Sequence, residues 1–115
     1  MAYDEGLAGR LRDLLHEEPA AAGHELSEKK MFGGLAFLVA GNMAIAVVSK
    51  GGVMVRVRPE ETERLVATTA AFPMEMRGRE MTGWVRVGDG DLSTKRQLSA
   101  WVRRGAAYAA SLPAK

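Results

Sequence analysis

The stretch that decides the fold is residues 28–57, EKKMFGGLAFLVAGNMAIAVVSKGGVMVRV. It contains four short β patterns in series, at residues 28–32, 35–39, 43–48 and 53–57. The turns at residues 40–42 and 49–52 are rich in Gly and Asn, which accept the positive φ angles of tight hairpins. The stretch therefore predicts a meander of antiparallel strands.

A helix is predicted on each side of this meander. Before it, Asp4 is placed to cap a helix that carries leucines at positions 7, 11, 14 and 15 and ends near Glu17. After it, Pro59 suits the first position of a short second helix, and two carboxylates follow where the helix dipole favours them.

Two further strands and a third helix complete the pattern. Met74–Met76 and Met81–Val87 are predicted to be strands joined by a turn. Thr94 and Gln97 then form a capping box, and Pro113 ends the last helix. Its side chains expected to pack on the sheet are Leu98, Trp101, Val102 and Leu112.

These elements predict one α+β domain spanning residues 1–115, in the order α-β(3-4)-α-β(2)-α. Strands joined by tight turns pair antiparallel, and three amphipathic helices must bury their apolar stripes on the sheet. The simplest solution is a two-layer fold with the three helices on one face of an antiparallel sheet. The other face of the sheet is then open.

Composition excludes several classes of protein. The chain has no cysteine, which rules out disulfides and thiolate zinc sites and fits a reducing cytoplasm. No signal peptide or membrane-spanning stretch is visible, so we expect a cytoplasmic location and no membrane partner. The net charge is only +2, smaller than that of a domain that binds nucleic acid through its whole field.

No catalytic signature is present, so we expect no enzyme activity, no catalytic residue and no cofactor. His16 and His24 are predicted to be solvated rather than metal ligands, and no metal site is expected. Gly33-Gly34 could cradle an anion beside Lys29 and Lys30, but the pair lies between strands, where a tight turn or bulge is the better interpretation.

The open face supplies the candidate interaction surface. Alternation in residues 53–58 and 81–87 places one set of side chains opposite the valines. This set includes Met54, Arg56, Arg58, Trp84 and Arg86. A scattered, solvated set of arginines is the competing interpretation. The six strand methionines are expected to be mostly core filler, with a minority on the open face as an adaptable binding surface.

The motifs KKMFGGLAF at residues 29–37 and GNM at 41–43 resemble the N-terminal domain of the TfoX/Sxy family. The resemblance continues through MVRV at 54–57, GREM at 78–81, GWV at 83–85 and LSAWV at 98–102. It implies a short stand-alone bacterial member with a fold similar to secretion-chaperone-type domains. It also implies a place among regulators of DNA-uptake competence, which carry a second, C-terminal domain. The family offers no catalytic residues.

Three functional hypotheses follow. The first is a non-enzymatic regulatory module that binds a protein partner, or a second copy of itself as a homodimer, through the open face or a sheet edge. The alternative is a nucleic-acid-binding domain in which Arg56, Arg58 and Arg86 contact phosphates and Trp84 stacks on a base. An enzyme is the third hypothesis, and it rests only on Gly33-Gly34 and the neighbouring lysines.

Overall fold

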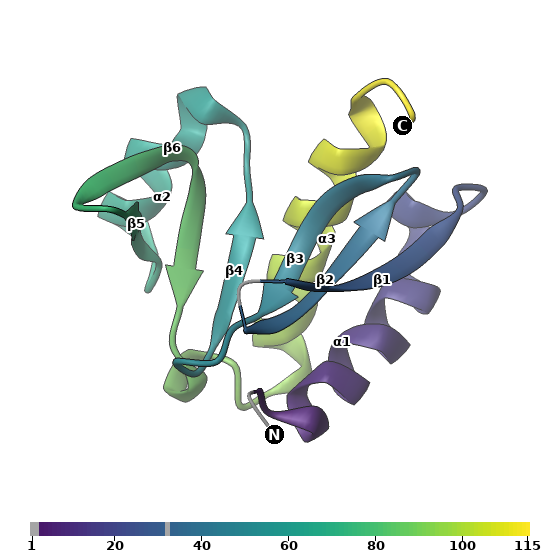
Figure 1. Ribbon diagram of the computed structural model, residues 1–115, viewed down its shortest axis with the longest axis horizontal. Coiled ribbons are helices and arrows are strands. Elements are labelled where there is room, and N and C mark those ends of the chain that lie inside the picture. The colour runs from purple at the N-terminus through teal and green to yellow at the C-terminus, as the bar shows by residue number, and fades with distance from the viewer. Residues whose placement is uncertain (1–2, 32) are drawn as a thin grey trace.

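The computed structural model describes residues 3–31 and 33–115 as a six-stranded antiparallel sheet with helices (Figure 1). The elements are α1 (Glu5–Glu17), η1 (Pro19–Ala21), β1 (Leu26–Met31), β2 (Gly34–Val39), β3 (Asn42–Val47), β4 (Val53–Arg56), η2 (Pro59–Glu61), α2 (Thr62–Thr68), β5 (Phe72–Met76), β6 (Arg79–Val87), η3 (Asp89–Asp91) and α3 (Lys95–Ser111), where η denotes a short 3-10 helix. The predicted α+β class and element order are confirmed.

The strands lie in the order β1-β2-β3-β4-β6-β5, so the chain leaves the meander after β4 and returns through α2. β6 therefore pairs with β4, and β5 becomes the edge strand. The meander itself matches the prediction: β2 and β3 are joined through Ala40 and Gly41, both at positive φ, as a tight two-residue hairpin turn requires.

Local signals position the helix ends. The Oδ1 atom of Asp4 accepts a hydrogen bond from the Leu7 N–H at 3.0 Å, and Thr94 and Gln97 form the predicted capping box. The second helix differs from the prediction. Pro59 begins a 3-10 turn, and α2 itself begins at Thr62.

The strands also extend beyond their predicted bounds. β1 begins at Leu26, β5 at Phe72 and β6 at Arg79, each two residues earlier than the sequence pattern indicated. The predicted first strand included Phe32, which lies outside the described residues.

The main core lies between the sheet and all three helices. It joins Val53, Val55 and Val57 of the β4 segment to side chains from each helix: Leu11 of α1, Leu65 of α2, and Leu98, Trp101 and Val102 of α3. Figure 1 shows α3 passing behind β3. The prediction of three helices on one face is thus confirmed, whereas Leu112, expected in the core, is only half-buried past the end of α3.

Two contacts fix α3 against the sheet. Gly105 lies so close to β3 that a Cβ atom there would be 2.4 Å from the carbonyl oxygen of Ala44. At the other contact, the buried side chain of Asn42 donates to the carbonyl oxygens of Ala109 at 3.4 Å and Pro113 at 3.0 Å. The end of α3 is therefore held on the β2–β3 turn. Within the described chain, no helix has both the length and the apolar character that crossing a membrane requires.

Candidate functional site

The sheet face opposite the helices, called the open face below, carries an apolar cluster of its own. Its buried members are Ala36, Ala46 and Met54, and its half-buried members are Met31, Leu38, Met43, Val48, Met74 and Trp84. Because side chains alternate along a strand, these residues lie on the side away from the main core. The open face is therefore largely apolar without being covered by a helix.

A small pocket lies within this cluster. Its lining, called the methionine pocket below, consists of Met43, Met54, Met74, Met76, Met81 and Trp84, and its volume is about 100 Å³. Strands β3 to β6 all contribute to it.

Strand β6, which contributes Met81 and Trp84 to the pocket, is bent. The pairing of β5 with β6 is irregular between Pro73 and Glu75, and Gly83 has a φ of +94°. Such an irregularity bends the strand, and Figure 1 shows β6 arching toward its hairpin with β5. The hydroxyl of Thr62 supports the bend, since it accepts a hydrogen bond from the Gly83 N–H at 2.8 Å.

The methionines are where the structure departs most from the sequence prediction. All six strand methionines, at positions 31, 43, 54, 74, 76 and 81, belong to the open-face cluster or line its pocket. None of the six is part of the main core, so the expectation that most are core filler is wrong. The sequence indicates the side of the sheet on which a methionine lies only where the methionine alternates with valines, as Met54 does.

Four of the five predicted surface residues form one block on the open face. Met54 pairs directly with Arg86, and Arg56 pairs directly with Trp84, on neighbouring strands β4 and β6. Residues paired in this way have Cβ atoms about 4.5–5.5 Å apart. Each arginine is therefore next to a residue that lines the methionine pocket.

Both arginines of the block lie over aromatic rings. The guanidinium carbon of Arg56 is 5.5 Å from the ring centroids of Trp84 and of Tyr108 on α3. That of Arg86 is 5.4 Å from the ring centroid of Phe72 on β5. At these distances the guanidinium groups form cation–π interactions with the rings. The interactions keep the two charges at the rim of the apolar surface.

One buried nitrogen of the Arg86 guanidinium group has no hydrogen-bond acceptor among the described residues. Its Nη2 donates to the carbonyl oxygen of Gly51 at 2.9 Å, but its buried Nε has no hydrogen-bond partner among the described residues. Neither Arg86 nor Arg56 forms an ion pair with a carboxylate of that part of the chain.

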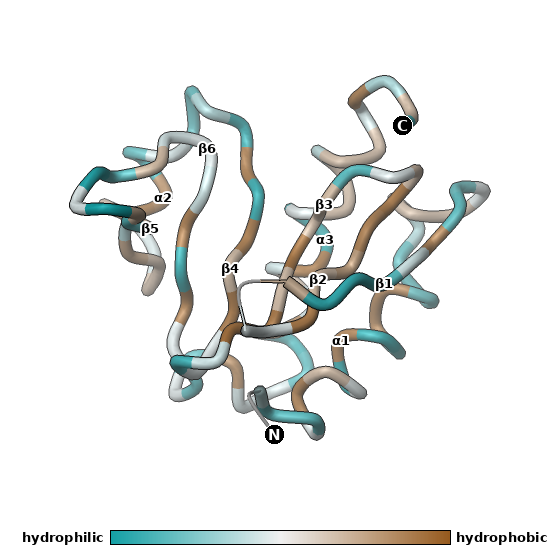
Figure 2. The backbone as a smooth tube through the Cα atoms, in the orientation of Figure 1, coloured by the Kyte–Doolittle hydropathy of each residue, from teal (hydrophilic) through white to brown (hydrophobic). Residues whose placement is uncertain are grey.

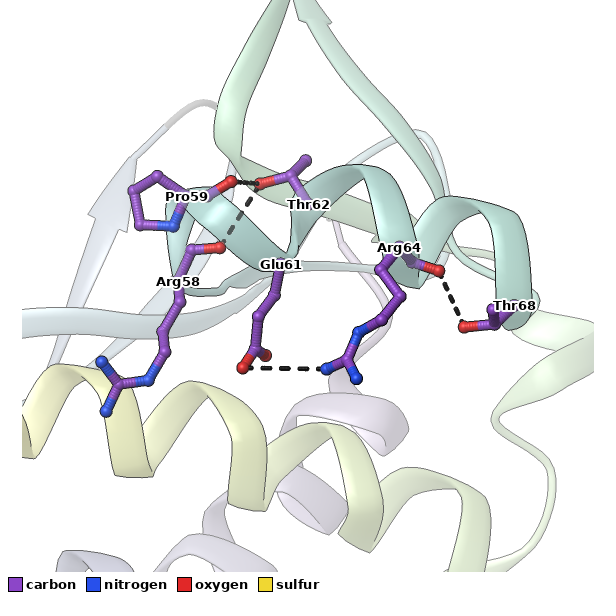
Figure 3. A network of polar contacts seen from close by, with 6 residues as sticks. All are labelled: Arg58, Pro59, Glu61, Thr62, Arg64 and Thr68. Carbon is purple, nitrogen blue, oxygen red and sulfur yellow. Dashed lines mark hydrogen bonds and ion pairs between the residues drawn. The ribbon is translucent and has the colours of Figure 1, made fainter.

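Arg58, the fifth predicted residue, lies elsewhere. β4 ends at Arg56, and the exposed Arg58 lines a different groove, with Glu61, Arg103, Arg104 and Tyr108. Figure 3 shows its side chain pointing toward α3, while its carbonyl oxygen accepts from the Thr62 hydroxyl at the start of α2. The expectation that Arg58 shares the open face is therefore wrong, because β4 ends at Arg56 and a 3-10 helix begins at Pro59, directly after Arg58.

The two edges of the sheet differ in polarity. β1 carries Glu28, Lys29 and Lys30, and Figure 2 shows its hydrophilic middle. Charged side chains on an edge strand discourage pairing with another chain. At the other edge, β5 carries two exposed large apolar residues, Phe72 and Met76, both next to the open-face cluster.

The remaining sequence candidates do not converge on a chemical site. His16 and His24 are both exposed. No three acidic or histidine side chains in residues 3–31 and 33–115 are grouped so that they could hold a metal ion. Arg12 donates to Glu28 through Nη2 at 2.8 Å, and this hydrogen bonding lowers the pKa of the Glu28 carboxyl.

The fold defines the chain as a two-layer α+β domain with one sheet face uncovered. The chain belongs to the TfoX N-terminal domain family, whose model matches residues 19–109. The matched region contains the whole sheet and most of α3. A comparison with curated proteins gives no match.

Proposed function

We propose that this protein is a non-enzymatic regulatory module of the TfoX type that binds a protein partner through its open sheet face. The observation that carries the proposal is the apolar cluster of nine side chains opposite the helices, which shares four residues with the methionine pocket. Uncovered apolar surface rimmed by polar groups is typical of protein interaction sites, and Met and Arg are enriched in such interfaces. Membership of the family supports a regulatory role, and a link to transcription or competence control in the cytoplasm is part of the proposal.

The charged groups elsewhere on the surface support a non-enzymatic role. A groove of about 380 Å³ between α2 and β6 contains Glu60, Glu63 and Glu80, but all three carboxylates are exposed. Catalytic acids and bases are usually partly desolvated, because burial and charged neighbours tune their pKa values. These three carboxylates are therefore better explained as a solvated rim.

The proposal is tested by capture from the cytoplasm of the native host, with and without nuclease. The immobilised wild-type protein is compared with Met76→Asp, which places a charge in the methionine pocket, and with Arg96→Gln on the exposed side of α3. We expect nuclease-resistant capture of a protein by the wild type and by Arg96→Gln, and its loss in Met76→Asp. Capture that Met76→Asp leaves unchanged would contradict a role for the open face.

Self-association is the second form of the proposal. The exposed Phe72 and Met76 on the β5 edge favour a homodimer formed at that edge. Light scattering over a wide concentration range then gives twice the monomer mass, and Met76→Asp restores the monomer. A monomer mass at every concentration would contradict the homodimer.

Nucleic-acid binding remains the competing function, because Arg56 and Arg86 are free of carboxylate partners in the described structure. However, Trp84 is half-buried and Arg56 already lies over its ring, so the ring is not free to stack on a base. We expect no binding of a mixed-sequence oligonucleotide at physiological salt. Micromolar binding, lost in a folded Arg56→Ala, Arg58→Ala, Arg86→Ala triple variant, would favour this function instead.

A further inference from the structure

The size of the methionine pocket restricts what can occupy it. At about 100 Å³ it is well below the roughly 300–1,000 Å³ of small-molecule sites. It is about two thirds of the volume of an engineered cavity, ~150 Å³, that holds benzene. The pocket therefore fits one aliphatic side chain that belongs to a larger molecule.

The lining of the pocket favours such a side chain. Every lining residue is Met or Trp, so a polar or charged group would be desolvated without carboxylate, amide or hydroxyl partners. Thioether side chains are flexible and adjust to the shape of the inserted group. A leucine or methionine from a partner is thus the expected anchor, in the way that interface anchors fill apolar pockets.

The charges around the pocket indicate the chemistry of the partner. The described strands contain three acidic residues, Glu28, Glu75 and Glu80. Glu28 pairs with Phe37 of the main core and is bound by Arg12 of α1. It therefore lies on the helix side of the sheet.

The other two acidic residues also point away from the open face. Glu75 lies between Met74 and Met76, which both line the pocket, so its side chain points to the opposite side. Glu80 pairs with Glu75 and lines the groove beside α2.

Among the described strand residues, the charged side chains on the open face are cations. Lys29 pairs with Ala36 of the open-face cluster, and Arg56 and Arg86 adjoin the pocket. The Nη2 atom of Arg86 donates to the carbonyl oxygen of Gly51 and its Nε atom is buried, so Nη1 is the nitrogen left for a group on a partner. A carboxylate is the group that best matches a guanidinium in charge and geometry.

We propose that the open face binds an acidic segment of a protein partner, with a leucine or methionine side chain in the methionine pocket and a carboxylate on Arg86. Met54 lines the pocket and pairs directly with Arg86, so the anchor and the acid are close neighbours on the partner. A spacing of three or four residues brings two side chains this close on a helix, and a spacing of two residues does so on a strand. The inference rests on the proposed function and adds the chemistry of the partner to it.

A second copy of this chain fits the open face less well. Among the described residues, the exposed large apolar side chains are Phe72 and Met76, and both adjoin the open face itself. Two copies packed face to face would bring two cationic faces together, with no acidic side chain among the described strand residues of either face, and like charges disfavour that contact. Pairing of two copies at the β5 edge does not stack the faces, so this repulsion does not oppose it.

The experiment is a selection of random 12-residue peptides displayed on phage against the immobilised wild-type protein. We expect enrichment of peptides with a leucine or methionine and an Asp or Glu within four residues of it. Enriched peptides are synthesised with a fluorescent label, and their affinity is measured by anisotropy. Replacing the peptide's acid by its amide, or its anchor by alanine, is expected to weaken binding about 10- to 100-fold each.

Protein variants show where the peptide binds. Arg86→Gln and Met76→Asp are expected to weaken binding by similar factors, while Arg96→Gln, which removes the same charge from the helix side, leaves affinity unchanged. Circular dichroism and urea melts establish that each variant folds. The amide and alanine peptides keep the test decisive if Arg86→Gln does not fold, since they use the wild-type protein.

The possible failures are distinguishable. Enriched peptides that bind Met76→Asp more weakly than the wild type, but contain no Asp or Glu, would overturn the proposal of an acidic partner. They would leave the proposed function standing. If no peptide is enriched, or if neither Arg86→Gln nor Met76→Asp weakens peptide binding, the proposal of an acidic partner is overturned. If Met76→Asp also leaves the capture of a protein from the host cytoplasm unchanged, the proposed function fails as well. Self-association abolished by Arg86→Gln as well as by Met76→Asp, or oligonucleotide binding abolished by Arg86→Gln, would assign the face to those occupants instead.

Discussion

Replacing Gly105 by alanine tests how closely α3 packs on the sheet. In the interior of a helix this change usually stabilises, because alanine has a helix propensity better than glycine by about 1 kcal/mol. At Gly105, however, the new Cβ atom would be 2.4 Å from the Ala44 carbonyl oxygen and 3.0 Å from its carbon. Ordinary contact begins at 3.4 Å, so α3 or β3 must move by about 1 Å.

Whether Gly105→Ala stabilises or destabilises the protein depends on the cost of overpacking and the gain in helix propensity. Overpacking a tight contact costs about 1–3 kcal/mol, and the obstacle here is backbone, which cannot rotate away as a side chain can. After the gain in propensity, we expect Gly105→Ala to lower the free energy of unfolding by up to about 2 kcal/mol. For a domain of this size the melting temperature falls by about 4 °C per kcal/mol.

Gly9→Ala is the matched control. Gly9 lies inside α1, and a Cβ atom there meets nothing within 4 Å. This variant should gain about 0.5–1 kcal/mol, because only the propensity term acts. Urea unfolding of the wild type and both variants measures the two effects. A Gly105→Ala protein as stable as Gly9→Ala would refute the close approach of α3 to β3.

Three further predictions concern the fold. Trp101→Ala should lower the free energy of unfolding by about 3–5 kcal/mol, since the ring is buried in the core, and a loss below about 1 kcal/mol in urea melts would contradict this packing. Asn42→Asp should destabilise more than Asn42→Ala, because a carboxylate cannot donate to the two carbonyls that the amide contacts; equal melting temperatures would count against these bonds. Arg12 lowers the pKa of the Glu28 carboxyl, so this contribution to stability is present above the ordinary pKa of glutamate and is lost as pH falls through the lowered value. The stability difference between wild type and Glu28→Gln, followed by urea melts from pH 7 to pH 3, should therefore shrink on acidification.

The side of the sheet on which a residue lies could be predicted where valines alternate with other residues. In residues 53–57 the valines mark the core side, so Met54 and Arg56 were correctly placed on the open face. The alternation carries no information about where the strand ends. Arg58 was misplaced for that reason, since β4 stops at Arg56 and a 3-10 turn begins at Pro59.

The methionine pocket could not be predicted, because it depends on contacts between distant segments. Met43 lies in an unbroken apolar run, which has no alternation and so does not indicate a side. The neighbours of Met54 are set by the pairing of β4 with β6, which skips β5. Met81 lines the pocket together with Trp84, although strict alternation along β6 would place the two on opposite sides of the sheet; β6 has a glycine at positive φ, Gly83, between them.

The two faces of the sheet differ in side-chain stiffness, and this difference bears on binding. The core side is dominated by Val and Ile, whose branching at Cβ restricts rotation and favours one well-defined packing. The open face has Met and Ala at the corresponding positions, and methionine side chains keep several accessible conformations. Because no methionine of the pocket belongs to the main core, the pocket can change shape around an inserted side chain without disturbing the contacts that hold α1 and α3 on the sheet. Binding on this face is therefore separable from folding, and open-face variants such as Met76→Asp measure recognition rather than stability.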